Sequence, residues 1–259
     1  MHRRAAPAVR PAGLPAAMAE EEAAEDHKTM ELIRASRALV FPPSEIFPHV
    51  KMHEMAECRI TYTVRSKRVA RWIRAVKRNF LDAAEVKIVG LDAEFTDPRG
   101  RGRDTQRAAV LQLSVASETL VFHVLHANEV PALLVEFLAD RNIRFCGAAI
   151  HNDVAMLKPY GIGIANAVDL QRVLWNPIPS KTTPSLFDLA NHHLGMSLVN
   201  KIKPAKRGEQ KTAEEIAEEK ELIWGWGNFP LTRKQIWYAA LDARLGFELA
   251  RAMWGAGGY

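Results

Sequence analysis

One ten-residue stretch, from Val86 to Phe95, constrains the fold more than any other part of the chain. It begins as an apolar run suited to the interior of a sheet, and it ends with two acids, Asp92 and Glu94. Because successive side chains of a strand point to opposite faces, these carboxylates face the same side of the sheet. A buried strand that ends in two acids needs a cation between them, unless both acids point into water. These ten residues alone leave both interpretations open.

The composition indicates a globular protein with a proper core. Of the 259 residues, 48% are hydrophobic and 25% are charged, which excludes disorder of the whole chain. No apolar run approaches the length of a membrane span, so we expect no membrane partner. The formal net charge of +5 permits a polyanionic partner without requiring one.

We expect the folded domain to occupy residues 58–259, after a leader and linker over residues 1–57 that is largely disordered or peripheral. The first 19 residues are rich in Arg, Ala and Pro and contain no acid, as in an organelle transit peptide. The alternative is a disordered leader with translation starting at Met18, and the acidic residues that follow favour it.

Predicted strands and helices alternate from residue 58 onward. Apolar patterns predict strands over residues 59–64, 110–115, 120–125, 143–150 and 162–170, the second and third of them forming a hairpin. Helices are predicted after Ser66 and over residues 131–138, 184–195 and 232–254, the last with Thr232 as its N-cap.

The helix predicted after Ser66 carries many Lys and Arg residues. Its apolar residues share one face, and the rest of its surface is basic, with Lys67, Arg68, Arg71, Arg74, Lys77 and Arg78. Such a row could follow a phosphate backbone. It is also typical of the solvated outer face of an amphipathic helix docked on a core, which is the commoner meaning of such a run.

Two other charged segments are predicted to lie outside the core. Residues 96–107 form a Gly/Arg loop without a phosphate-cradling spacing, and it leaves the strand next to Glu94. Residues 201–221, in which bases are followed by acids, predict an exposed helix or a partly ordered flap. Three arginines of the first loop are candidates for holding a substrate phosphate, or are plain solvated residues: Arg99, Arg101 and Arg103.

Two further acids stand at the ends of, or within, apolar elements. Asp153 follows a predicted strand at the start of a helix, where a simple N-cap role would also explain it. Asp242 lies one helical turn after Tyr238, so the two side chains share a face of the final helix. An acid within a core face needs a cationic partner or a metal. We therefore hypothesise that Asp92, Glu94, Asp153 and Asp242 converge on two divalent ions.

Three segments carry a family resemblance: Leu91–Phe95, the segment around Asp153, and Tyr238–Asp242. In order and spacing they resemble the motifs of the DEDDy-type 3′–5′ exonucleases of the ribonuclease H-like superfamily. The likeness is closer to the exonuclease domain of Werner syndrome helicase and to the stand-alone plant proteins built from that domain. It spans roughly residues 58–254 and includes the flanking segments 110–113, 121–124 and 228–231.

The resemblance implies a fold and an activity. The implied fold is a ribonuclease H-like three-layer α/β fold, with a mixed central sheet that has one antiparallel strand and helices on both sides. The implied activity is metal-dependent 3′–5′ hydrolysis of nucleic-acid phosphodiester bonds by a two-metal-ion mechanism, with DNA favoured. Two alternatives stay open: an RNase D-like RNA 3′ processing enzyme, and a non-catalytic binding module for nucleic acid or protein on the same fold.

The resemblance also implies individual roles. Asp92, Glu94 and Asp242 would hold a first Mg²⁺ or Mn²⁺, and Asp92 with Asp153 a second. Tyr238 would orient the attacking water, because a phenol with a pKa near 10 is a poor base at neutral pH. A helicase or another protein is a conceivable partner, and nucleus or cytoplasm is expected ahead of an organelle. Expected substrate contacts are Phe95, Asn152, Arg99, Arg101 and Arg103.

Overall fold

The computed structural model describes residues 40–41, 58–98, 106–198 and 212–255. The predictions for the leader and linker over residues 1–57 therefore lie outside the described residues, apart from positions 40 and 41. The predictions for Arg99, Arg101 and Arg103, and for the charged insert up to residue 211, lie outside them as well.

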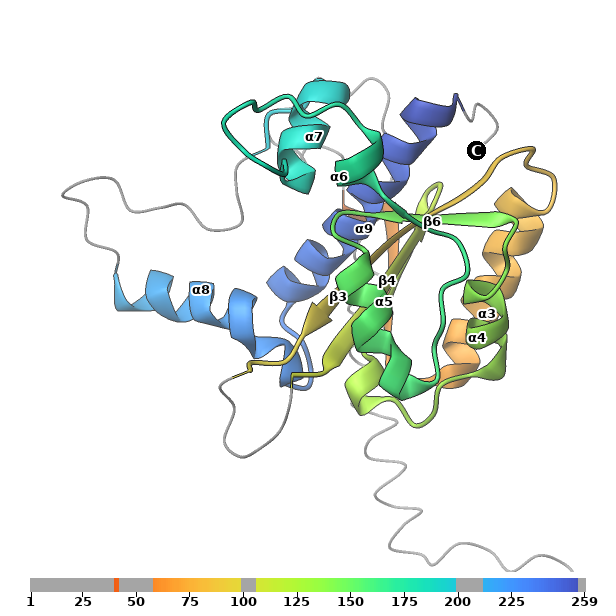
Figure 1. Ribbon diagram of the computed structural model, residues 1–259. Coiled ribbons are helices and arrows are strands. Elements are labelled where there is room, and N and C mark those ends of the chain that lie inside the picture. The colour runs from red at the N-terminus through yellow and green to blue at the C-terminus, as the bar shows by residue number, and fades with distance from the viewer. Residues whose placement is uncertain (1–39, 42–57, 99–105, 199–211, 256–259) are drawn as a thin grey trace, which may run out of the picture.

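A mixed sheet forms the centre of the molecule (Figure 1). Its seven strands lie in the order β1-β2-β5-β4-β3-β6-β7. Strand β4 runs antiparallel to both of its neighbours, whereas β2, β3, β5, β6 and β7 share one direction. The strands are β1 (Val40–Phe41), β2 (Cys58–Thr63), β3 (Lys87–Phe95), β4 (Ala108–Val115), β5 (Glu118–Phe122), β6 (Ile143–Gly147) and β7 (Ala167–Asp169).

The predicted mixed sheet is confirmed for the six strands from β2 onward, among which β4 is the antiparallel one. The two-residue strand β1 adds a short antiparallel pairing to the outer edge of β2, with Val40 opposite Arg59. Two predicted strands end earlier than their apolar runs. Strand β6 stops at Gly147 because the chain turns at Ala149, and β5 stops at Phe122 because the next residues form a 3-10 turn.

Helices cover both faces of the sheet (Figure 1). Helices α3 (Ser66–Val76), α4 (Ala132–Leu138) and α5 (His151–Leu157) lie on one side. Helix α9 (Arg233–Trp254) lies on the other side and contacts α6 (Leu170–Val173) and α7 (Leu186–His193). Helix α8 is Ala213–Trp224, and the shorter helices are η1 (Lys77–Leu81), η2 (Val124–His126), η3 (Lys158–Tyr160) and η4 (Gly225–Gly227).

Helix α3 has the apolar period that the sequence predicts. Val69, Trp72, Ile73 and Val76 are buried, at the spacing i, i+3, i+4 and i+7 of one helix face. This face packs on β2, β5 and α4, and a π-helical stretch, η1, continues the helix. The basic residues of α3 consequently form the outer surface of this layer.

The last two long helices begin with reciprocal side-chain caps. In α8 the Thr212 hydroxyl accepts from the backbone N–H of Glu215, and in α9 the Thr232 hydroxyl accepts from that of Gln235. The predicted N-cap at Thr232 is therefore confirmed. The second half of the predicted charged insert is an exposed helix, α8. Among the helices that the structure describes, none combines the length and the apolar composition that crossing a bilayer requires.

A buried hydrogen-bond chain fixes the segment that leads into α9. The backbone N–H of Leu231 donates to the Tyr62 hydroxyl at 3.2 Å, and that hydroxyl lies 3.0 Å from Nδ1 of His123. Nε2 of His123 lies 3.1 Å from the carbonyl oxygen of Trp226, which can only accept. The imidazole therefore carries its proton on Nε2 and accepts from Tyr62 at Nδ1. Burial, and next the neighbouring His126, lower the pKa of His123 to about 3.

His123 makes the fold sensitive to acid. Because the pKa of His123 is lower in the folded protein than in the unfolded chain, the unfolded chain takes up the proton first as the pH falls. Stability is therefore lost as the pH falls from about 6.5 toward 3. Between pH 7 and pH 5 this one group is expected to remove about 2 kcal/mol. His123→Gln keeps one donor and one acceptor without titrating in this range. Urea unfolding at both pH values should show that the wild type loses about 2 kcal/mol more stability between pH 7 and pH 5 than the variant does. Parallel curves of stability against pH would contradict the assignment.

Candidate metal site

Strand β3 delivers two acids to one end of the sheet. Val89, Leu91 and the residues around them are fully buried, whereas Asp92 and Glu94 near the end of the strand are half-buried. The register with β4 shifts between Glu94 and Phe95. An irregularity of this kind disturbs the pairing locally and re-aims the side chains beside it. Glu94 lies directly before the irregularity, and Asp92 lies two residues earlier in the regular ladder.

Helix α9 approaches this strand at backbone contact distance. A Cβ atom added at Gly90 would overlap the carbonyl oxygen of Ala243 and lie 2.6 Å from the backbone nitrogen of Phe247. A Cβ atom added at Gly246 would lie 2.7 Å from the carbonyl oxygen of Cys146 on β6. Only glycine leaves room for this approach. The pairing of these two glycines brings the α9 face that carries Asp242 onto the strand that carries Asp92.

Three of the predicted acids converge as a result. Asp92, Glu94 and Asp242 each offer a carboxylate oxygen, and these oxygens all lie within 4.8 Å of one another. All three side chains are half-buried. Carboxylate oxygens are hard donors of the kind that Mg²⁺ and Mn²⁺ prefer. This group of residues could therefore hold a divalent metal.

Asp153, on α5, is not one of these three acids, but it lies close enough to β3 to be affected by the charge of Glu94, and it is only 4% exposed. The N-cap position of α5 is Ile150, so Asp153 lies in the first turn of the helix and is not its cap. The simple capping role that the sequence left open is therefore wrong. Burial, and next the charge of Glu94, hold the pKa of Asp153 well above its usual range, although its own backbone N–H and that of Ala93 partly offset this shift. A cation placed between these carboxylates would relieve the effect.

The approach to Asp153 depends on an acid to which the sequence analysis gave no role. The turn between β6 and α5 places Ala149 at a φ of +52°, a left-handed conformation that costs an alanine energy. Oδ1 of Asp169 accepts from the backbone N–H of Ala149 at 3.1 Å and from that of Gln171 at 3.1 Å. Asp169 thereby stabilises the turn that aims α5 at the site. Its position at the end of a short strand was the available signal.

Gln112 is a second residue whose place emerged only in three dimensions. It lies directly opposite Asp92 in the β3–β4 ladder, so both side chains are on the same face of the sheet. Gln112 is fully buried, and within the described part of the chain neither of its side-chain amide atoms has a hydrogen-bond partner. A polar residue in the middle of the apolar run 110–113 was the signal for it.

For the remaining predicted site residues, the structure gives burial and position in the helices and strands. Tyr238 is half-buried one turn before Asp242, with its ring edge-on to Trp237 at 5.5 Å between centroids. Phe95 is half-buried at the end of β3, and Asn152 is exposed in the first turn of α5.

The fold and the acid cluster together define a class of protein. The chain belongs to the 3′–5′ exonuclease family, whose model, described as "3'-5' exonuclease", matches residues 68–256. The mouse protein named "Bifunctional 3'-5' exonuclease/ATP-dependent helicase WRN" is 29% identical over 161 residues, covering 61% of this chain and 10% of that protein. A "3'-5' exonuclease" of Arabidopsis thaliana is 26% identical over 175 residues, covering 66% and 54%. This chain thus spans about half of one relative and a tenth of the other.

Solved structures agree on the fold. The exonuclease domain of Nibbler from Aedes aegypti has a TM-score of 0.53 at 15% identity, covering 80% of this chain and 92% of that one. The RNase D–GMP complex of Trypanosoma brucei has a TM-score of 0.53 at 20% identity, covering 76% and 57%. The predicted family and the predicted ribonuclease H-like fold are confirmed.

Proposed function

We propose that this chain is a metal-dependent 3′–5′ exonuclease that hydrolyses phosphodiester bonds from the 3′ end of a nucleic acid, with DNA favoured over RNA. The observation that carries the proposal is the convergence of Asp92, Glu94 and Asp242 beside the buried Asp153. Membership of the 3′–5′ exonuclease family supports it. A non-catalytic module on the same fold would have no need of a complete acid set, which stands against that alternative.

The acid set suits two divalent ions, Mg²⁺ or Mn²⁺. Asp92, Glu94 and Asp242 would hold the first ion, and Asp92 with Asp153 the second. Bound there, the ions supply an activated water and stabilise charge on the leaving 3′ oxygen. The placement of Asp153 supports this assignment, because its carboxyl is buried and close to the charge of Glu94, where a cation would stabilise both groups.

The protein residues supply orientation around the ions. Tyr238, one turn from Asp242 on α9, directs its hydroxyl at the attacking water and holds it in line by a hydrogen bond. Phe95 and Asn152, which neighbour the acids of β3 and α5, contact the terminal nucleotide. Three arginines of the 96–107 loop, Arg99, Arg101 and Arg103, are proposed to bind its phosphate.

An end-labelling assay tests the proposal. With Mg²⁺ or Mn²⁺, a 5′-labelled DNA strand should shorten stepwise, and a 3′-labelled strand should lose its label at once. Chelation by EDTA should abolish both results, since the site consists of carboxylates. Matched RNA strands compare the two substrates, and faster degradation of RNA would support an RNase D-like enzyme instead. Absence of any metal-dependent degradation would contradict the enzyme.

The proposed function also includes a protein partner and a location in the cell. One relative is named as an exonuclease and a helicase in a single protein. We infer that a separate helicase could present strand ends to this chain, in the nucleus or the cytoplasm. Imaging the full chain with a fluorescent tag in cells tests the location, and a purely organellar signal would contradict it.

A further inference from the structure

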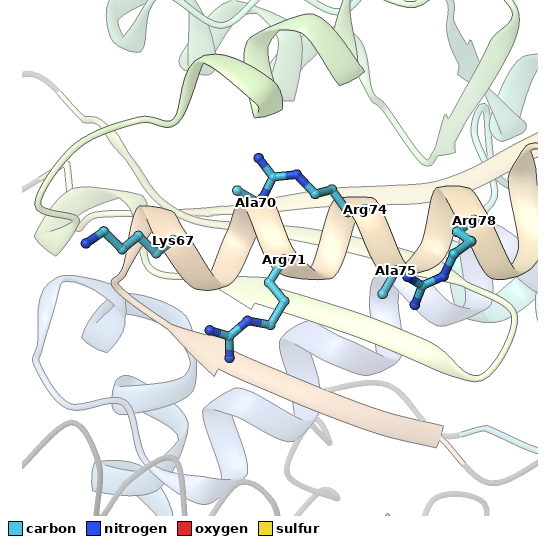
Figure 2. A pocket seen from close by; sticks show the side chains of 6 residues that line it. All are labelled: Lys67, Ala70, Arg71, Arg74, Ala75 and Arg78. Carbon is cyan, nitrogen blue, oxygen red and sulfur yellow. The ribbon is translucent and has the colours of Figure 1, made fainter.

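The outer face of α3 carries a series of exposed Lys and Arg residues along its length (Figure 2). Lys67, Arg71, Arg74 and Arg78 are all exposed, and they are spaced i, i+4, i+7 and i+11 along α3 and its continuation η1. At about 1.5 Å of rise per residue the row is about 16 Å long. The outer surface of this helix therefore presents four cations at successive positions along its length.

Acidic groups do not neutralise this row. The sequence from Ser66 to Leu81 contains no Asp or Glu, and the first acid after it is Asp82, four residues past Arg78 at the end of the row. In the part of the chain that the structure describes, no carboxylate forms an ion pair with any of the four bases. The nearby Glu118 pairs with Arg59 at 2.8 Å, and Glu129 accepts from Ser66. Like charges one turn apart destabilise a helix by their mutual repulsion, so a bound polyanion would stabilise this surface.

The row borders two shallow hollows. The first, about 500 Å³, lies along α3 with the small side chains of Ala70 and Ala75 between the bases. The second, about 580 Å³, extends from Arg71 across to Arg59 on β2. Figure 2 shows Arg71 and Arg74 reaching out from different sides of the helix. The hollows thus extend from the helix to the ion pair of Arg59 and Glu118 on the neighbouring strands, and they leave room for a backbone to approach the four bases of the helix.

This surface is separate from the acid cluster. Helix α3 packs on β2, β5 and α4, on the face of the sheet opposite α9 (Figure 1). Asp242 belongs to α9, and Asp92 lies on β3, two strands away from β5 in the sheet order. A ligand on α3 would therefore not occupy the site of hydrolysis.

We propose that the α3 row binds the phosphate backbone of duplex nucleic acid, independently of base sequence. One strand of a duplex presents a phosphate about every 3.4 Å along the axis, so a row of about 16 Å faces about five phosphates. Surfaces for single strands add aromatic side chains on which bases stack. Among the residues that line the two hollows, the one aromatic is Trp72, which is 5% exposed. The surface is therefore suited to contact phosphates, without contacts to the nucleobases that would distinguish one sequence from another.

Salt-dependent binding tests this second site. The full chain and the variant R71Q/R74Q/R78Q are titrated in EDTA against a duplex of about 20 base pairs and a single strand of equal length, by fluorescence anisotropy from 50 to 200 mM NaCl. Losing three phosphate contacts should make the slope of log K against log salt shallower by about 2 to 3 and weaken duplex binding more than tenfold. The single strand should lose less than threefold.

The matched control is R141Q/K158Q/K220Q, which removes the same charge from three exposed bases on other elements. It should bind the duplex within about twofold of the wild type, since it leaves the row intact. Equal weakening by both triple variants, no weakening by the α3 variant, or an equal loss on single strands would each overturn the proposal. Chelation prevents hydrolysis, so the result is independent of whether the chain proves to be an exonuclease.

Discussion

Asp92→Asn is expected to lower the rate of 3′–5′ hydrolysis by about a thousandfold or more while the fold stays intact. Asp92 is the acid proposed to touch both metal ions, and asparagine has the same shape without the charge. Its carboxylate oxygen lies within 4.8 Å of those of Glu94 and Asp242. Without metal these like charges repel, so the neutral variant should be at least as stable as the wild type in EDTA.

Single-turnover kinetics with excess protein, together with thermal unfolding in EDTA, measure both effects. Asp82→Asn removes an exposed acid at the end of η1 and serves as the matched control, with an unchanged rate. Tyr238→Phe keeps the ring and loses the hydroxyl, so a smaller loss of about ten- to a hundredfold is expected. A rate for Asp92→Asn within tenfold of the wild type would show that the cluster is not the site of hydrolysis.

Gly90→Ala is expected to cost the fold about 3 kcal/mol or more, although it adds a single methyl group. That methyl group would overlap the carbonyl oxygen of Ala243, and both nearest atoms belong to the backbone of α9. A backbone cannot rotate away as a flexible side chain can, so the helix must shift away from β3. Molecules that still fold should also lose activity, because Asp242 moves away from Asp92 together with the helix.

Urea unfolding and the yield of soluble protein measure this effect. Gly163→Ala is the matched control, since a Cβ atom there meets nothing within 4 Å and the residue is exposed. Its stability should stay within about 0.5 kcal/mol of the wild type. If Gly90→Ala unfolded within 1 kcal/mol of the wild type, the tight contact between β3 and α9 would not exist in solution.

Much of the fold was predictable because its elements carry strong local signals. The apolar run that ends in Asp92 and Glu94 became β3, and the long pattern capped by Thr232 became α9. Strand ends were less predictable. The run 143–150 stays apolar past Gly147, but the chain turns out of the sheet at Ala149, whose backbone N–H donates to Asp169.

Part of the candidate site was likewise predictable from the sequence, and part was not. Its acids could be named from their positions at the ends of apolar elements, but Asp169 and Gln112 were given no role, because their importance comes from neighbours distant in sequence. The row of bases on α3 is the opposite case. Its helical period was visible, but only the packing showed that the buried face lies on β2 and β5 and that no described carboxylate pairs with the row.

The sequence by itself determined which residue types this protein has for its chemistry: a pair of acids at a strand end, an acid near a helix start, and a Tyr one turn before an Asp. Those properties depend on chain geometry over a few residues, which spacing encodes. Only the tertiary structure decided that three of these carboxylates meet within 4.8 Å. That distance depends on Gly90 and Gly246, whose missing side chains let a helix and a sheet touch backbone to backbone.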